Sequence, residues 1–174
     1  IEAALAERFA EHNYRFISRP LAAVPTGKAA QAFLSEQGIT QVINTALMSL
    51  PAEQLPSLLQ PGPLLSLLNA VEQLQLPYIQ LSSSQVFSGA ESRRYKVSDL
   101  AEPNTELGQL HRRVESYTRK HVERYILLRT GALFSEHGDN VLTYLLGQFR
   151  RGGDVKLSLH GHSAPVYVDD LARV

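Results

Sequence analysis

Helical and extended patterns alternate along this chain, and that alternation constrains its fold more than any other feature. Apolar residues recur at helical spacing in some segments, and short apolar runs bounded by turn residues separate them. Strands that alternate with helices of this length pair in parallel through right-handed crossovers. The sequence therefore predicts an α/β fold with a doubly wound parallel sheet covered by helices. We expect a first helix around Ile1, Leu5 and Phe9, further helices over 27–37, 63–74, 105–121 and 140–150, and strands over 14–17, 41–45, 78–81, 124–129 and 155–159.

Two turn residues support these boundaries. Gly38 follows the second predicted helix, where glycine readily adopts the left-handed conformation that ends a helix. Pro63 stands at the start of the third, where its missing N–H costs no hydrogen bond. The predicted helices thus begin and end at residues that suit those positions.

Composition is that of one ordinary soluble domain. The chain has 174 residues, of which 44% are hydrophobic, and its 17 Lys and Arg balance 17 Asp and Glu. Balanced charge gives no reason to expect nucleic acid or an acidic membrane as a partner. Cysteine is absent, which excludes disulfides and thiolate metal sites. No apolar run reaches the roughly 20 residues of a membrane span, so we expect a cytoplasmic protein.

Small and polar residues follow the predicted strands. In open parallel sheets, ligands lie outside the carboxyl ends of the strands, so these residues are candidates for a binding site. Exposed loops are also polar without binding anything, and position alone names no ligand. The candidates are Ser18, Arg19, Thr45, Ala46, Ser82, Ser83, Ser84, Thr130 and Gly131.

Several motifs together resemble one family. Residues 81–89 read L-S-S-S-Q-V-F-S-G and are similar to the segment S-T-D-Y-V-F-D-G of the dTDP-4-dehydrorhamnose reductase (RmlD-like) family, a branch of the extended short-chain dehydrogenases. Residues 95–99 and 103–108, with Glu115, are similar to the family's Y-x-E-x-D, P-x-N-x-Y-G-x-x-K and following Glu. Further similar segments lie, in the same order as in the family, at 42–46, 129–134, 138–141 and 163–172.

The resemblance implies a Rossmann-like NAD(P)-binding domain over 1–174, with 131–174 including the start of a substrate-binding part. It also implies that the sequence lacks the first strand, the glycine loop that receives the cofactor pyrophosphate, and most of the C-terminal substrate domain. On this interpretation the chain is a partial view of a longer protein.

The same resemblance identifies a catalytic triad of which one member remains. Ser83 matches the family's catalytic Ser/Thr, while Leu107 stands at the tyrosine and His111 at the lysine. Leucine has no proton to give, so the general acid is lost. A neutral imidazole cannot replace the lysine cation, although a protonated His111 could in part. We expect Leu107 to pack on its helix and His111 to be a solvated helix residue. Tyr95 and Tyr117 are nearby tyrosines, but neither matches the catalytic position.

Other site residues carry over from the family. The cofactor is expected to be NADPH or NADH if the glycine loop exists outside this chain. Arg19 stands where a basic residue favours the extra phosphate of NADPH, although a lone loop arginine is more often simply solvated. The cofactor-binding candidates are Arg19, Thr45, Ala46, Ser82 and Thr130, and the substrate-binding candidates are Ser84, Gln85, Asn140 and Pro165.

Two further groups have alternative readings. The basic residues Arg112, Arg113, Arg119, Lys120 and Arg124 could contact a diphosphate or a partner, but the interleaved Glu115 and Glu123 favour a salt-bridged exposed helix. His160 and His162 form an H-x-H pair that, without a third ligand, we do not expect to bind a metal.

Two functions follow. We favour a catalytically degenerate relative that acts as an NAD(P)- or sugar-nucleotide-binding protein or as a regulator of another enzyme. The alternative is an active NADPH-dependent reductase of a nucleotide-linked 4-keto sugar, for which the sequence shows no proton donor at Leu107. A homodimer is possible with either function, since an apolar helix face could serve a dimer or the core.

Overall fold

The structure is a computed structural model that describes residues 1–49, 62–91, 93–156 and 164–174. It divides into two compact units, one of residues 18–129 and one of residues 1–17 and 130–174. Each unit is described by itself.

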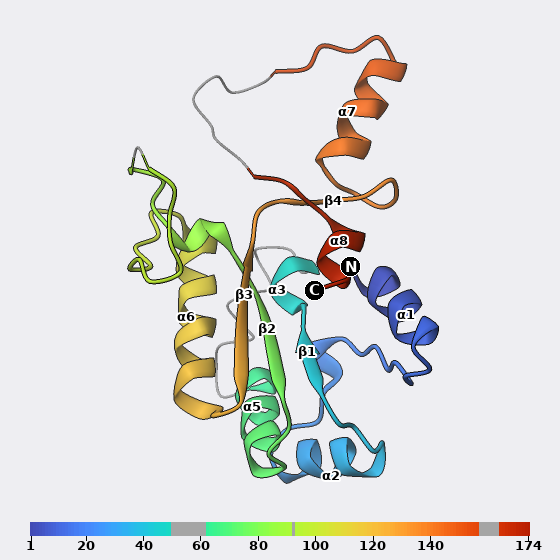
Figure 1. Cartoon of the computed structure of the whole chain (residues 1–174), viewed down its shortest axis with the longest axis vertical. Helices are drawn as coiled ribbons and strands as arrows, with labels where there is room; N and C mark the ends of the chain where they lie inside the picture. Colours follow the sequence, from blue (N-terminus) through green and yellow to red (C-terminus); the bar gives the residue numbers. More distant parts are fainter. Residues whose placement is uncertain (50–61, 92, 157–163) are drawn as a thin grey trace. The chain divides into compact units, whose positions relative to one another are not determined.

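The unit of residues 18–129 is built on a three-stranded sheet. Its strands β1 (Val42–Asn44), β2 (Tyr78–Ser83) and β3 (Tyr125–Thr130, of which all but the last residue belong to this unit) lie in that order, as Figure 1 shows. β1 and β2 are parallel, with Asn44 opposite Gln80. Because parallel strands end at the same edge, the residues that follow β1 and β2 lie on one side of the sheet. The predicted parallel pairing is confirmed.

Helices connect these strands. The helices are α2 (Lys28–Glu36), α3 (Ala46–Ser49), α5 (Pro63–Gln73) and α6 (Glu106–His121), with short 3-10 turns η1 (Leu21–Ala23) and η3 (Ser84–Val86). α5 packs against both α2 and α6, and α6 lies along β2. Gly38 adopts the left-handed conformation just beyond α2, and Pro63 begins α5, as the sequence predicts.

The apolar core lies between this helical layer and the sheet. It includes Leu34 of α2, Leu64 and Leu68 of α5, and Val114 of α6, all at most 4% exposed. Side chains alternate between the faces of a strand, so Tyr78, Gln80 and Ser82 of β2 share one face. Tyr78 is part of the core, which places that face of β2 toward the helices.

A buried polar group joins β1 to β2 within this layer. The Asn44 amide donates to the Tyr78 hydroxyl at 2.9 Å and to Gln80 Oε1 at 3.0 Å, and Tyr78 donates to the same Gln80 oxygen at 2.8 Å. Burial raises the pKa of the Tyr78 phenol, which therefore stays protonated as a donor. Asn44 Oδ1 also accepts the N–H of Ala46 at 3.1 Å and so fixes the turn after β1.

The second unit contains α1 (Glu2–Glu11), α7 (Val141–Arg150), α8 (Val168–Ala172), and a two-stranded parallel pair of β4 (Leu133–Phe134) and β5 (Val166–Tyr167). α1 packs against α8. A Cβ at Gly131, just before β4, would overlap the carbonyl oxygen of Ala164, so this glycine allows the chain to enter the pair.

One predicted strand is wrong. Residues 14–17 form no strand: the Tyr14 N–H donates to Phe9 O at 2.8 Å, and the rings of Tyr14 and Phe16 pack on Phe9 at 5.9 and 5.7 Å. These aromatic residues fold back on α1 instead of pairing with a neighbouring strand. Part of the strand predicted over 155–159 lies outside the described residues, and the described residues there, 155 and 156, form no strand.

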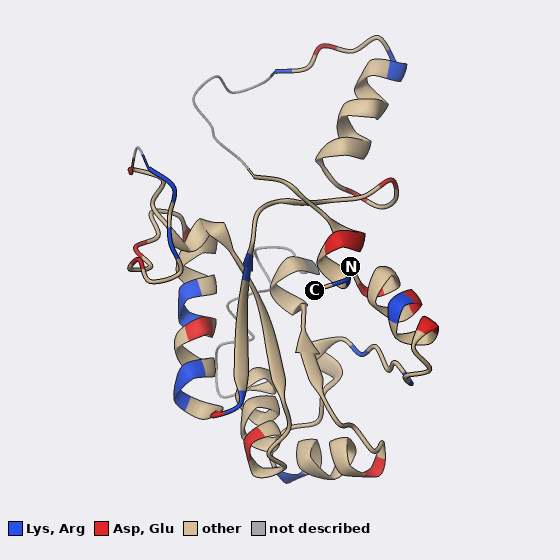
Figure 2. Ribbon diagram, in the orientation of Figure 1, with Lys and Arg blue, Asp and Glu red and all other residues tan. Residues whose placement is uncertain are grey.

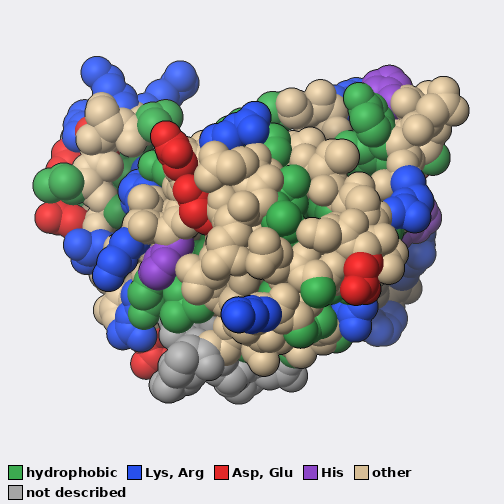
Figure 3. Space-filling view, turned by 90° about the horizontal axis from the view of Figure 1, so that it is seen from below, with side chains coloured by type: hydrophobic (Ala, Val, Ile, Leu, Met, Phe, Trp, Pro, Cys, Tyr) green, Lys and Arg blue, Asp and Glu red, His purple; other side chains and the backbone are tan. Residues whose placement is uncertain are grey.

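Charged side chains are dispersed. Figure 2 shows basic and acidic residues interleaved along α6, and on the face in Figure 3 Lys and Arg lie in separate groups. In the described part of the chain, every helix is too short or too polar to span a membrane.

Candidate functional site

The segment of residues 82–87, here called the serine turn, closes β2. Ser83 caps η3, where its Oγ accepts the N–H of Gln85 at 3.2 Å, and the Phe87 N–H donates to Ser84 O at 3.1 Å. Ser83 is 7% exposed. A hydroxyl both accepts and donates, so with its oxygen used by Gln85 the Ser83 hydroxyl can still donate its proton to a ligand oxygen.

Helix α6 approaches the serine turn closely at Gly108. A Cβ there would overlap the carbonyl oxygen of Gln85 and come within 2.7 Å of Pro103 Cβ. Thr105 caps the helix by accepting the Gly108 N–H at 3.0 Å. The sequence thus puts the first turn of α6, which carries Leu107, directly beside the serine turn.

Leu107 and His111 both face inward on this helix. Leu107 is half-buried and packs against the apolar core, as expected for helix packing. His111 is only 2% exposed, so the prediction of a solvated histidine is wrong. The reason is its place between Leu110 and Val114 on the face of α6 that covers the sheet, a placement that helical spacing alone did not reveal.

The buried imidazole is electrically neutral near neutral pH. Burial lowers the pKa of His111 to about 4, although the charge of Glu115 acts in the opposite direction. Its Nδ1 atom, like Thr118 Oγ1, has no hydrogen-bond partner among the described residues. His111 therefore does not supply the cation that a lysine would place there.

Glu115, one helical turn after His111 on α6, forms a fully buried charged centre. Its carboxylate accepts from Ser82 Oγ at 2.8 Å, from Arg129 Nε and Nη2 at 2.8 and 2.7 Å, and from Arg119 Nη2 at 3.2 Å. Burial raises the pKa of Glu115, but the hydrogen bonds from Arg129 and Ser82 outweigh it and hold the pKa below its usual range. Glu115 is therefore ionised.

This centre was missed at the sequence level. The sequence predicts Glu115 as a surface partner of basic residues, and one such pair does exist, with Arg119 at i+4. Yet Glu115 itself is 0% exposed and its main partner is Arg129 in β3. The glutamate that follows the family pattern and the arginine that opens the 129–134 segment were the available signal.

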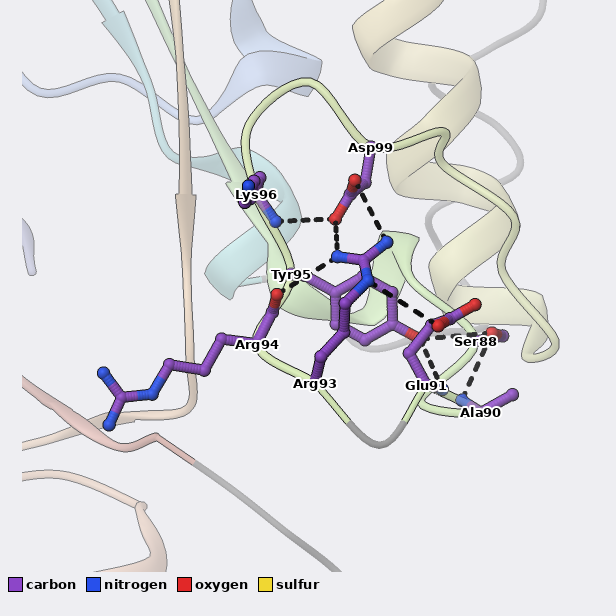
Figure 4. A network of polar contacts seen from close by, with 8 residues as sticks. All are labelled: Ser88, Ala90, Glu91, Arg93, Arg94, Tyr95, Lys96 and Asp99. Carbon is purple, nitrogen blue, oxygen red and sulfur yellow. Dashed lines mark hydrogen bonds and ion pairs between the residues drawn. The ribbon is translucent and has the colours of Figure 1, made fainter.

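The loop that follows the serine turn is held by hydrogen bonds and ion pairs among its own residues, as Figure 4 shows. Arg93 forms two hydrogen bonds with Asp99, at 2.7 and 3.3 Å, and Asp99 also accepts the Lys96 N–H at 2.7 Å. Tyr95 stacks on Phe87 with ring centres 4.4 Å apart. A hydrogen bond with Ser88, then one from the Glu91 N–H, lowers the pKa of Tyr95. Its hydroxyl thus takes part in ordering the loop.

The predicted cofactor residues have varied surroundings. Arg19 is exposed; its guanidinium lies over the Phe33 ring at 4.6 Å and donates to Ala23 O at 2.8 Å. Thr45 is buried at the end of β1, and Ala46 begins α3. Ser82 donates to Glu115, as described above. Thr130 is buried and donates to Gly131 O at 3.1 Å. The structure brings Thr45, Ala46 and Ser82 to one edge of the sheet.

The predicted substrate residues lie in both units. Ser84 and Gln85 are exposed in the serine turn. In the other unit, Asn140 caps α7 by accepting the N–H groups of Leu142 and Thr143 at 3.0 and 3.2 Å, and Pro165 is exposed next to β5. Asn140 thus has a structural task, and substrate contact at these four positions stays a prediction.

The described residues contain no group of three or more His, Cys, Asp or Glu side chains that could hold a metal ion. The H-x-H pair of His160 and His162 lies outside the described residues.

Solved structures similar to this chain include two reductases and a further enzyme. A dTDP-4-dehydrorhamnose reductase from Clostridium acetobutylicum has a TM-score of 0.82 and 20% identity over 98% of this chain and 63% of that one. A dTDP-4-dehydrorhamnose reductase from Bacillus anthracis in complex with NADP has a TM-score of 0.79 and 15% identity over 98% and 64%. The Bordetella bronchiseptica enzyme WbmG in complex with NAD and UDP has a TM-score of 0.80 and 8% identity over 98% and 62%.

These likenesses confirm the Rossmann-like α/β fold, and identities this low show the fold alone. The chain spans less than two thirds of each of the three structures. No curated protein sequence matches the chain. The family described as RmlD substrate binding domain matches residues 3–174, which is nearly the whole chain. The chain therefore belongs to the RmlD substrate binding domain family.

Proposed function

We propose that this protein is a catalytically degenerate member of its family that binds NAD(P) or a sugar nucleotide and acts by binding or by regulating an enzyme partner. The observation that carries the proposal is the neutral, buried His111 one turn from the core-packed Leu107. Neither side chain offers the proton or the fixed cation that carbonyl reduction needs in this family.

The residues present fit a nucleotide in part. Small side chains follow β1 and end β2 at one sheet edge, where Rossmann-like folds bind nucleotides, and solved relatives are complexes with NADP or with NAD and UDP. A bound nicotinamide would supply a hydride. Thr45, Ala46 and the serine turn would hold the nucleotide, while Ser83 would donate a hydrogen bond to a ligand oxygen.

An active NADPH-dependent reductase of a nucleotide-linked 4-keto sugar is the second candidate. It is supported by Ser83, whose hydroxyl caps the turn as an acceptor and keeps its proton for a carbonyl oxygen. This function requires a proton donor other than Leu107.

The first experiment is a titration of the full-length gene product with NADPH, in which the fluorescence of the nucleotide reports binding. Saturable binding is the expected result, and its absence, together with absent binding of dTDP or UDP, would contradict the proposal.

The second experiment separates the two candidates by turnover. The native protein is expected to show no NADPH oxidation with a nucleotide-linked 4-keto sugar, whereas Leu107→Tyr combined with His111→Lys is expected to gain it. Leu107→Phe with His111→Lys is the matched control, because it restores the ring and the amine without the phenol. Robust native turnover that Ser83→Ala abolishes would establish the active reductase instead.

A further inference from the structure

Arg129 is linked to both ends of the serine turn, to one end directly and to the other through Glu115. Its guanidinium forms two hydrogen bonds with Glu115, at 2.8 and 2.7 Å, and Glu115 in turn accepts the hydroxyl of Ser82, the first residue of the turn. The same guanidinium lies over the ring of Phe87, the last residue of the turn, at 5.0 Å. One side chain of β3 thus fixes the residues on both sides of Ser83 and η3.

The chemistry of this contact requires arginine. A planar guanidinium can pair with both carboxylate oxygens and present a face to an aromatic ring at the same time, which a lysine ammonium cannot do. Arg129 is only 16% exposed and Glu115 is 0% exposed, so their interaction is shielded from water. Pairing with Glu115 raises the pKa of Arg129 and keeps the guanidinium charged.

Arg119 provides an internal comparison. It also pairs with Glu115, at 3.2 Å, but its side chain is 46% exposed and it sits on α6 itself, four residues from Glu115. Of the two arginines, Arg129 is the one with a ring contact in the serine turn. A role confined to neutralising Glu115 would be shared by both.

We infer that Arg129 is a positioning residue for the serine turn, acting through Glu115 on Ser82 and through its own stacking on Phe87. It holds Ser83 in the orientation in which its hydroxyl can meet a ligand oxygen, and this consequence rests on the proposed function. The positioning of the turn itself does not depend on any ligand.

Hydrogen exchange of single backbone amides in the full-length protein tests the inference. The reporters are the N–H groups of Gln85 and Phe87, which bond to Ser83 Oγ and Ser84 O. Arg129→Lys keeps the charge beside Glu115 and is expected to speed exchange at both amides by about tenfold, because local opening of the turn becomes easier. Amides of α5 are expected to exchange as in the native protein.

Two further variants keep the test decisive. Arg119→Lys is the matched control and is expected to change the Gln85 rate by less than about twofold. If Arg129→Lys accelerates exchange throughout the chain, Phe87→Leu tests the inference in its place. This variant removes the ring contact and leaves the ion pair between Arg129 and Glu115. Faster exchange of the Gln85 amide is again expected. Native protection at Gln85 in both Arg129→Lys and Phe87→Leu, or equal acceleration in Arg119→Lys, would overturn the inference.

NADPH affinity is a separate measurement. Arg129→Lys is expected to raise the dissociation constant by about tenfold and Arg119→Lys to leave it unchanged, because only the first loosens Ser83. If Arg129→Lys accelerates exchange but leaves the affinity native, the turn is positioned without serving the nucleotide. If the native protein binds neither NADPH nor dTDP or UDP, the proposed function fails, while the exchange data still test the positioning role.

Discussion

Helices α6 and α7 have similar local designs and different surroundings. Each begins with a side chain that accepts backbone N–H groups, Thr105 for α6 and Asn140 for α7. α6 is rich in charge yet buries six residues, among them His111 and Glu115. α7 is more apolar, but none of its residues is buried, and Tyr144 and Phe149 are 57% and 66% exposed. The polarity of a helix therefore does not determine how many of its residues are buried. That number depends on which other elements pack against the helix.

The largest expected effect is in the buried ion pair of α6. Arg129→Met would leave the Glu115 carboxylate without its main partner in the interior, at an expected cost of about 3–5 kcal/mol in the free energy of unfolding. Urea unfolding followed by circular dichroism measures it. Arg150→Met at the exposed end of α7 is the control and should change stability by less than about 0.5 kcal/mol. Equal effects of the two changes would remove the distinction between the helices.

A second effect is pH dependence from His111. Its pKa is lowered from 6.5 to about 4 in the folded protein, so the unfolded chain binds the proton first as pH falls. The free energy of unfolding is thus unaffected by His111 titration above about pH 6.5. It falls between about pH 6.5 and 4 by an amount on the order of 3 kcal/mol, as the unfolded chain takes up the proton.

Unfolding free energies at about pH 7.5 and about pH 4.5 measure this loss. His111→Leu should lose less stability across that window than the native protein. At the higher pH it should leave the free energy of unfolding nearly unchanged, because it removes an Nδ1 atom that has no hydrogen-bond partner among the described residues. The same pH loss in both proteins would show that other groups cause it.

Two glycines sharpen the comparison at a smaller scale. Gly108→Ala forces a methyl against the Gln85 carbonyl and should cost about 1–3 kcal/mol in unfolding free energy. Gly147→Ala in α7 meets only the end of the Arg151 side chain at 3.5 Å and should stabilise the protein by up to about 1 kcal/mol. Thermal unfolding of the two variants checks both signs, and a stabilising Gly108→Ala would show that α6 does not need the close approach.

The smallest expected effect is at the apolar surface of α7. Phe149→Ser replaces a ring that is already 66% exposed, so the unfolding free energy should change by less than about 0.5 kcal/mol. A loss above about 2 kcal/mol, measured by urea unfolding of the full-length protein, would show that another part of the protein covers this helix.

Much of the local structure followed from the sequence. The helices predicted over 105–121 and 140–150 are observed as α6 and α7 with their caps, and the strands predicted at 41–45, 78–81 and 124–129 are observed as β1, β2 and β3. Periodicity and capping are local properties, which is why they were readable. The strand predicted over 14–17 is wrong because a strand needs a neighbouring strand to pair with, whereas Tyr14 and Phe16 pack against Phe9.

For the candidate site too, some features could be predicted from the sequence and others could not. The resemblance predicts Ser83, Leu107 and His111 as site positions, because matching motifs specify positions along the chain. The charge state of His111 and the links from Glu115 to Ser82 and Arg129 could not, since they join residues 14 and 33 positions apart in sequence.

The sequence by itself determined the family and most of the order of helices and strands, because both depend on residue identities and their spacing along the chain. That Leu107 and His111 replace a tyrosine and a lysine stays a prediction from the resemblance. Only the tertiary structure decided that His111 is buried and neutral, that Glu115 is an interior charge, and that Arg129 holds both ends of the serine turn. Burial and charge pairing depend on which distant side chains pack together, and helical spacing specifies a face without specifying what covers it.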